Sequence, residues 1–168
     1  MEGIKQTLWF ILLVFLQVGV FDKIHIFGYA TPLLYIYFII QLPINLNRNT
    51  VVLLAAMLGL CIDLFSYTLG LNMLACVVAG FFRHYLLKLF APKDTHEGYF
   101  PASVTLGRTL FFRYAIGMIL LHQLVLFSIE SLSLFDPLNL FLRVVGSFTL
   151  TFILIFGLVN LNWGGTKQ

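Results

Sequence analysis

The chain has 168 residues, of which 60% are hydrophobic and only 10% are charged. Typical globular chains are roughly 45–50% apolar and about 25% charged, so this composition excludes an ordinary soluble domain and indicates a polytopic membrane protein. The net charge of +3 is too small and too dispersed for a nucleic-acid-binding protein, which needs a dense basic patch.

Six apolar segments are predicted to cross the membrane, although a helix needs about 20 apolar residues to span the hydrocarbon core. They cover residues 6–21, 30–46, 51–65, 69–90, 109–129 and 138–161. The first has no small-residue cleavage site and is interpreted as a retained span rather than a signal peptide. Several segments are short, so tilt or local thinning of the bilayer is expected. Together they predict one membrane domain, an all-α bundle of six transmembrane helices.

Two prolines mark the second segment. Pro32 stands at a predicted helix start, where its missing N–H costs nothing. Pro43 lies near the far end, where it is expected to kink or end the helix. The only loop of any size is predicted over residues 91–108, which contain two further prolines.

The basic residues predict the orientation of the chain. If both termini lie on one side, that side collects eight of them, namely Lys5, Arg48, Arg83, Lys88, Lys93, Arg108, Arg113 and Lys167. The opposite side has only Lys23, together with the acidic residues Asp22, Glu130 and Asp136. Because cytoplasmic loops are enriched in Lys and Arg, the termini are predicted to be cytoplasmic. An odd number of spans would break this pattern.

Two charged residues remain inside the spans and away from the cytoplasmic interface, Asp63 and Arg143. A charge within the membrane costs roughly a few kcal/mol or more, so each needs a partner or a function. One hypothesis is that they pair, directly or through water, in the outer half of the bundle. The alternative is that each reaches the outer headgroups separately, Arg143 by snorkelling. Asp63 is also predicted to clamp two helices together, beside the turn that carries Gly70 and Asn72.

The remaining polar residues of the spans are interpreted as structural. Arg83 and Lys88 are predicted to reach the cytoplasmic headgroups rather than to bind a ligand. Four side chains can form hydrogen bonds between helices, namely Gln17, Gln41, His122 and Gln123. A proton relay is disfavoured, because one histidine and one distant aspartate do not make a file of titratable groups.

Small residues indicate close helix contacts. Gly59 lies four residues after Ala55 and therefore on the same helix face, as close approach of two backbones requires. Gly70 is expected to have a positive φ in the turn or to mark a helix start. Cys61 and Cys76 form no CxxC motif and are interpreted as packing residues rather than redox or metal ligands.

The sequence contains no motif of a membrane enzyme. It has no HExxH, no GxSxG with a reachable histidine and no P-loop. Asp63 has no acidic companion within the spans, which argues against an aspartyl-type peptidase. We therefore expect no catalysis, no metal and no cofactor.

Five short motifs follow one another within residues 12–83. They are LLVFLQ in the first span, Ala30-Thr31-Pro32 before an aromatic-rich segment, Gln41-Leu42-Pro43-Ile44-Asn45 at its end, Gly59-x-x-x-Asp63-Leu64, and Thr68-Leu69-Gly70-Leu71-Asn72. In this order and spacing they resemble the bacterial rod-shape-determining MreD family. The second half of the chain is similar only in hydropathy and length, and residues 91–108 depart from the compact loop expected of the family.

The resemblance implies a six-helix inner-membrane protein, similar in fold to the substrate-binding subunits of energy-coupling-factor vitamin transporters. It implies a non-catalytic scaffold of the cell-wall elongation machinery that offers lipid-exposed faces to the single transmembrane helix of MreC. The wider complex would include MreB, RodA and a class B penicillin-binding transpeptidase. The main alternative is a subunit of a small-molecule transporter. That function would need a polar cavity open to the outside, which Asp63, Asn72 and Arg143 could line.

Overall fold

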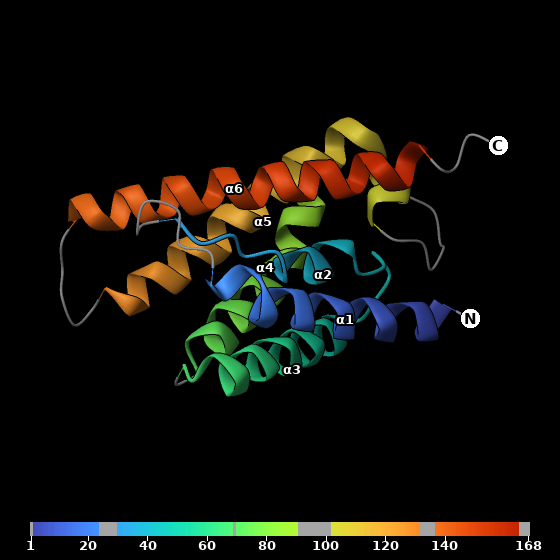
Figure 1. The fold of residues 1–168 in the computed structure, drawn as a ribbon. Coiled ribbons are helices and arrows are strands. Elements are labelled where there is room, and N and C mark those ends of the chain that lie inside the picture. Colours follow the sequence, from blue (N-terminus) through green and yellow to red (C-terminus); the bar gives the residue numbers. More distant parts are fainter. Residues whose placement is uncertain (1, 24–29, 69, 91–101, 132–136, 165–168) are drawn as a thin grey trace.

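The structure, a computed structural model, describes residues 2–23, 30–68, 70–90, 102–131 and 137–164. They form the helices α1 (Glu2–Gly19), α2 (Ile36–Gln41), α3 (Arg48–Ser66), α4 (Leu71–Phe90), α5 (Ala102–Glu130) and α6 (Pro137–Gly164), with a short 3-10 helix η1 (Phe21–Lys23) after α1. The long helices run back and forth along the bundle, and α1 begins at the end where α6 finishes (Figure 1). We call this the terminal end, and the opposite end, with η1 and the α3–α4 turn, the distal end.

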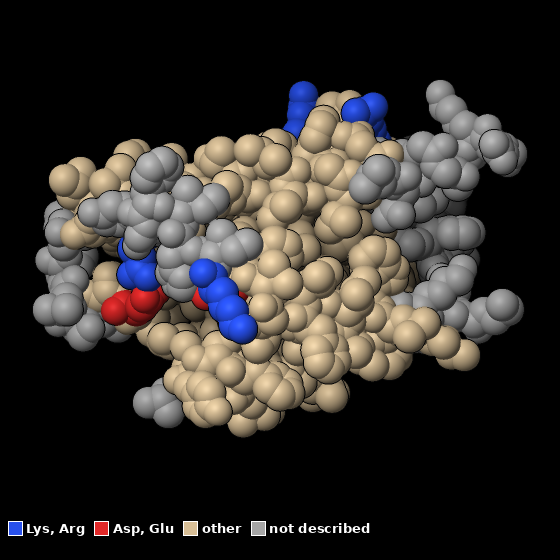
Figure 2. Space-filling view, in the orientation of Figure 1, with Lys and Arg blue, Asp and Glu red and all other residues tan. Residues whose placement is uncertain are grey.

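Five helices, α1 and α3 to α6, are long and apolar enough to cross a membrane. Their outward faces carry large exposed apolar side chains, among them Leu8, Phe15, Leu53, Leu64, Leu89, Phe141 and Ile153. Figure 2 shows a broad uncharged surface between the two ends of the bundle. Exposed apolar surface of this extent marks a membrane or protein contact. The chain is therefore an all-α protein of membrane character, as the composition predicts.

The second predicted span has a different structure from the others. The sequence predicts a helix over residues 30–46, but α2 has only six residues, and extended chain precedes it. Residues 32–40 are all buried, and α2 contacts α1, α3, α4 and α5. Extended backbone is tolerated at membrane depth only where protein surrounds it, because lipid cannot satisfy its N–H and C=O groups. The prediction of one continuous helix is wrong.

Residues 30–43 nevertheless cover about the length of one membrane crossing. Extended residues rise about 3.3 Å each and helical residues about 1.5 Å each, so the segment reaches roughly 30 Å, near the thickness of the hydrocarbon core. In Figure 1 it leads through the middle of the bundle towards the terminal end, where α3 begins. The segment therefore runs along the bundle, and α3 begins at the end from which α1 started.

Helices α3 and α4 approach each other closely through small residues. A Cβ atom added to Gly59 would lie 2.4 Å from Met73 Cα, and one added to Gly80 would lie 3.0 Å from Ala55 Cβ. Glycine and alanine permit this distance because they leave the backbone surface bare. The close contact predicted from the spacing of Ala55 and Gly59 is confirmed.

The loop predicted over residues 91–108 is shorter in the structure, because α5 already begins at Ala102. Gly107 interrupts this helix with a φ of 71°, a left-handed value that glycine adopts without a steric penalty. The short helical piece before Gly107 therefore changes direction relative to the rest of α5. Residues 91–101 lie outside the described part of the chain.

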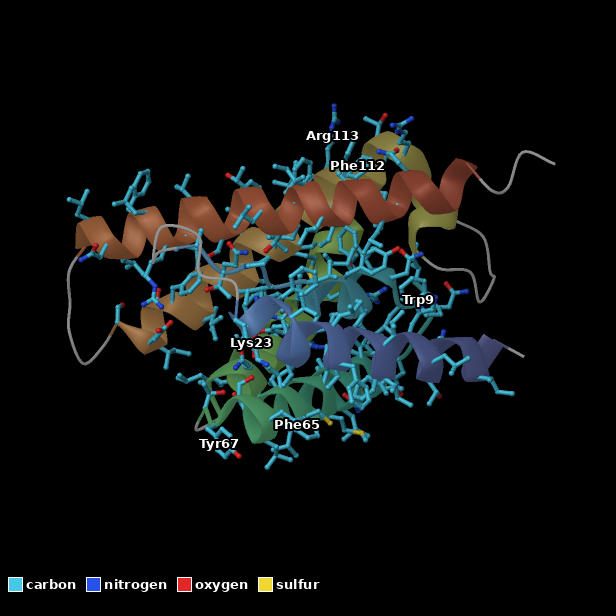
Figure 3. The ribbon with its side chains drawn as sticks, in the orientation of Figure 1. Trp9, Lys23, Phe65, Tyr67, Phe112 and Arg113 are labelled. Carbon is cyan, nitrogen blue, oxygen red and sulfur yellow. The ribbon has the colours of Figure 1, made fainter. Side chains whose placement is uncertain are left out.

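Among the described residues, the acidic side chains Asp22, Asp63 and Glu130 lie at the distal end, whereas basic side chains lie at both ends, with Lys23 and Arg143 at the distal one. The described basic residues of the terminal half include Arg48, Lys88 and Arg113, all outside the core. Figure 3 shows Arg113 pointing away from the bundle, on the side opposite to α3. The acidic side chains gather at the distal end (Figure 2), where Asp22 and Glu130 lie. This is the division on which the orientation prediction depends.

Candidate functional site

Asp63 lies buried in the last turn of α3 and joins this helix to α4. Its Oδ1 accepts hydrogen bonds from Thr68 Oγ1 at 2.5 Å, Asn72 N at 3.0 Å and Asn72 Nδ2 at 2.9 Å. Its Oδ2 accepts one from Met73 N at 2.8 Å. Asn72 and Met73 open α4, where unpaired N–H groups and the helix dipole favour a carboxylate. These are the contacts of the structural clamp that the sequence predicts.

The turn between α3 and α4 brings these donors to Asp63. Tyr67 and Gly70 both have left-handed backbone, with φ values of 55° and 76°. The positive φ predicted for Gly70 is therefore confirmed, and a glycine adopts it without steric cost. Asn72 Nδ2 also lies 3.0 Å from Thr68 Oγ1 and donates to it. The whole turn is thus organised around one carboxylate.

A chain of hydrogen bonds continues from Asn72 into the core. Tyr35 Oη donates to Asn72 Oδ1 at 2.7 Å and lies 3.1 Å from His122 Nε2. Because the single hydroxyl proton is used on Asn72, His122 Nε2–H donates to Tyr35 Oη. Both rings are completely buried. The chain from Asp63 to His122 therefore links α3, α4, α5 and the buried segment around α2.

Side chains of α6 hold the extended backbone before α2. Ser147 Oγ accepts a hydrogen bond from Thr31 N at 3.0 Å, and Thr151 Oγ1 accepts one from Leu33 N at 2.9 Å. Both hydroxyl residues are fully buried, and Gln123 Nε2 of α5 also donates to Thr151 Oγ1 at 3.1 Å. Alternate backbone amides of an extended chain point to the same side, so two residues one helical turn apart can serve both.

A glutamine of α1 completes this arrangement. Gln17 is fully buried; its Oε1 accepts a hydrogen bond from Leu34 N at 2.9 Å, and its Nε2 donates to Pro32 O at 3.1 Å and to Asp22 Oδ1 at 2.7 Å. Pro32 stands between two amides that donate to α6 and has no N–H of its own to satisfy. Its predicted place at a helix start is wrong, because α2 begins only at Ile36.

Arg83 supports the other end of α2. Its side chain is buried, with 2% exposed, and its Nε donates to Ile39 O at 3.0 Å. Its Nη2 donates to the carbonyls of Leu42 and Pro43. The last carbonyls of a helix lack internal partners, so the guanidinium replaces the missing donors. The prediction that Arg83 reaches the headgroups is wrong, whereas the predicted end of the helix near Pro43 is confirmed.

A cavity of about 260 Å³ lies at the distal end, next to the Asp63 turn, and is lined by both polar and apolar side chains. Its lining includes the side chains of Asp22, Thr31, Thr68, Asn72 and Arg143. Both acidic residues of the lining are already engaged, because Asp22 accepts hydrogen bonds from Gln17 and from the Ser66 hydroxyl and Glu130 pairs with Arg143.

The proposed pair of Asp63 and Arg143 is not formed. Arg143 instead makes an ion pair with Glu130, with 2.7 Å between Nη2 and Oε1, and lies 5.2 Å from the ring centroid of Phe127. The side chains of the pair are 35% and 38% exposed. Asp63 obtains its partners from the neighbouring turn, so the two charges are satisfied separately although both residues line or adjoin the distal cavity.

Three residues of this network are absent from the set predicted from the sequence. They are Tyr35, Ser147 and Thr151, all fully buried. The spacing of Ser147 and Thr151 gives a detectable signal, because two hydroxyls four residues apart share one face of an otherwise apolar helix. Tyr35 gives none, because aromatic residues surround it in the sequence.

Among the described residues, no group of three or more His, Cys, Asp or Glu side chains could hold a metal ion. No protein-family model matches the chain, and neither a curated protein nor a solved structure matches it. The contacts described above and the sequence resemblance are therefore the grounds on which a function can be proposed.

Proposed function

We propose that this chain is a non-catalytic membrane scaffold of the bacterial cell-wall elongation machinery, and that it binds a bitopic partner such as MreC within the membrane. The observation that carries the proposal is the division between interior and surface. The buried polar side chains bond to backbone and to one another, as Asp63, Arg83 and Thr151 do. The outward faces of the long helices are apolar.

The MreD-like motifs support the same proposal, because they contribute residues that hold the centre of the bundle. Thr31 and Pro32 belong to the extended segment that α1 and α6 fix in place. Asp63 and Asn72 form the clamp between α3 and α4. A bundle fixed in this way presents rigid faces, and rigid faces lower the entropic cost of binding a partner helix.

Two further parts of the proposal follow from the resemblance and the charge distribution. The terminal end, with Arg48, Lys88 and Arg113, would face the cytoplasm. MreB, RodA and a class B penicillin-binding transpeptidase would be the other members of the complex in the bacterial inner membrane.

Depletion of the protein in its host followed by microscopy tests the proposed function. We expect rod shape to be lost and insertion of new wall along the cell cylinder to stop. Re-expression of the full chain should restore both. Cells that keep their shape and their wall growth without the protein would contradict the scaffold proposal.

A tryptophan scan of exposed positions can locate the partner face. Leu8→Trp and Phe15→Trp alter α1, Leu64→Trp alters α3, and Phe141→Trp and Ile153→Trp alter α6, all at side chains exposed outside the bundle. We expect one helix face to lose co-purification with an MreC-like protein while the thermal stability of every variant stays near that of the wild type. If all variants retain the partner, docking on these faces is wrong.

The distal cavity favours a second candidate, the substrate-binding subunit of a small-molecule transporter. Its volume of about 260 Å³ is below the roughly 300–1,000 Å³ typical of ligand sites, but its polar side chains, among them Thr31, Asn72 and Arg143, are of the kind that orients a small ligand. Native mass spectrometry and thermal shift of the purified protein discriminate the two functions. A ligand that raises the stability of partner-free protein would favour transport, whereas co-purification with a bitopic wall protein would favour the scaffold.

A further inference from the structure

An open apolar groove lies between α3 and α4 in the terminal half of the bundle. Its volume is about 700 Å³, within the range of roughly 300–1,000 Å³ typical of ligand sites. The walls are apolar or aromatic, with Leu53 and Ala56 from α3 and Phe81 and Tyr85 from α4, and Arg48 stands at one end. This groove shares no residue with the hydrogen-bond network around Asp63.

The guanidinium of Arg48 rests on aromatic rings rather than on an acidic side chain. Its central carbon lies 3.5 Å from the ring centroid of Phe81 and 5.4 Å from that of Tyr85. No acidic residue within the described ranges pairs with it. A guanidinium stacked on a ring still has its N–H edge free, and this edge matches the oxygens of a phosphate group.

Among the residues that the structure describes, the charged neighbours of Arg48 are basic. Lys88 lies on α4, one turn beyond Tyr85, and is exposed. Arg48 and Lys88 are both close enough to His84 for their charges to act on its ring. The acidic residues Asp22 and Glu130 lie at the opposite end of the bundle, beside the distal cavity. The end of the groove at Arg48 is therefore complementary to an anion.

The length of the groove indicates which kind of anionic ligand it could hold, a lipid or a partner helix. From Arg48 to Ala56 there are two turns of α3, or about 12 Å, which is close to the depth of one leaflet of a core about 30 Å thick. A partner's transmembrane helix would need a groove of the full thickness. An acyl chain that begins at an interfacial phosphate needs only one leaflet.

We propose that this groove binds one anionic phospholipid, with its phosphate on Arg48 and an acyl chain along Leu53 and Ala56 between α3 and α4. Basic pockets between transmembrane helices are known to select lipids with charged headgroups. The proposal does not depend on the scaffold function, since it follows from Arg48 and the groove alone.

Native mass spectrometry of the full chain, titrated with phosphatidylglycerol or with phosphatidylcholine of the same acyl chains, tests the proposal. We expect one phosphatidylglycerol to bind about tenfold more tightly than phosphatidylcholine, because both lipids offer a phosphate to Arg48 but the choline cation of the second is repelled by Arg48 and Lys88. Arg48→Gln should abolish this preference, and Arg48→Lys should keep most of it. The matched control Arg113→Gln, on the opposite side of the bundle (Figure 3), should behave like the wild type.

Filling the groove tests the acyl chain separately. Ala56→Phe should weaken phosphatidylglycerol binding about tenfold although Arg48 is intact, whereas Leu64→Phe, at an exposed position of α3 outside the groove, should not. Soluble glycerol 3-phosphate should not displace the lipid. All variants are compared only as monodisperse protein with wild-type circular dichroism. If Arg48→Gln does not fold, the lipid preference of Arg48→Lys is compared with that of the wild type instead.

Three results would overturn the proposal. Equal losses in Arg48→Gln and Arg113→Gln would mean diffuse charge attraction without a site. Displacement by glycerol 3-phosphate would mean a site for free phosphate. Unchanged lipid binding in Ala56→Phe, with loss of a co-purifying single-span protein, would assign the groove to a partner helix.

Discussion

The buried polar side chains of this protein bond mainly to places where the backbone lacks a helical partner. Asp63 accepts from the first amides of α4, and Arg83 donates to the last carbonyls of α2. Within a bilayer such backbone groups find no water, so each costs several kcal/mol if it is left unpaired. The charges inside the bundle thus have a structural use that does not require a ligand.

Replacing Asp63 with alanine should therefore destabilise the protein strongly. The change removes the acceptor of the Asn72 and Met73 amides, and hydrogen bonds to a charged group contribute about 1.5–3 kcal/mol. We expect a loss of about 3 kcal/mol in equilibrium unfolding by dodecyl sulfate in mixed micelles. Arg143→Gln breaks a partly exposed ion pair with Glu130 and a long contact with the Phe127 ring, and should cost less than about 1 kcal/mol. Equal effects of the two substitutions would contradict the assignment of Asp63 as the clamp.

A lysine should not replace Arg83. Its single ammonium cannot reach the Ile39 and Leu42 carbonyls with the two-sided geometry of a guanidinium. We expect Arg83→Lys to lower the free energy of unfolding by about 2 kcal/mol, measured in the same assay. Arg113→Lys, at an exposed site, should change it by less than about 0.5 kcal/mol. If Arg83→Lys is as stable as the wild type, a headgroup role for Arg83 regains support.

At the scale of elements, the segment around α2 is held by the helices that surround it. Its extended part donates to Ser147 and Thr151 of α6 and to Gln17 of α1. The four-residue spacing of the two hydroxyls on α6 matches the alternate amides of Thr31 and Leu33. Helix and extended chain fit here because two residues of a strand rise about 6.6 Å and one helical turn about 5.4 Å.

Thr151→Val tests this support with little change in volume. It removes the acceptor of the Leu33 amide and of Gln123 Nε2, and an unpaired buried donor costs about 1–3 kcal/mol. We expect a destabilisation of about 2 kcal/mol and faster hydrogen exchange at the Leu33 amide.

The matched control for that substitution is Thr149→Val. Thr149 is exposed and bonds only to the carbonyl of Val145, on its own helix. Its replacement should change the stability by less than about 0.5 kcal/mol. Slow exchange at Leu33 in Thr151→Val would show that α6 does not protect the extended chain.

At the scale of the whole molecule, the number of passes decides on which side each loop lies. Five helices alone would place α1's start and α6's end on opposite sides of a membrane. In Figure 1 the buried segment of residues 30–43 runs from the distal end to the terminal end of the bundle, so α1 begins at the end where α6 finishes. The predicted cytoplasmic location of both termini needs an even number of crossings.

Cysteine labelling checks the sixth pass directly. In a chain with Cys61 and Cys76 replaced by alanine, Lys23→Cys and Asn47→Cys place single thiols at exposed positions before and after the segment. We expect an impermeant maleimide to label Lys23→Cys in intact cells and Asn47→Cys only after permeabilisation. Labelling of both from outside would show that residues 30–43 enter and leave the membrane on one side.

Much of the fold could be predicted from the sequence, because hydropathy and the positions of charged residues act over short stretches. Five of the six spans, the Asp63 clamp and the positive φ of Gly70 follow from such local patterns. The extended chain at Thr31 could not be predicted in this way, because its hydrogen-bond acceptor Ser147 lies 116 residues further along. The same limit explains why the contacts of Arg83 could not be predicted, because they depend on where α2 ends, about 40 residues earlier in the chain.

The dependence of the second pass on α6 has a consequence for biogenesis. The ribosome releases Thr31 and Leu33 long before Ser147 and Thr151 are made, so the acceptors of these two amides are not present until α6 has been synthesised. We therefore expect the insertion machinery to shelter this part of the chain until α6 has been made. A chain that stops after α5 would leave the Thr31 and Leu33 amides without their α6 acceptors. Quality-control proteases of the membrane are expected to remove it.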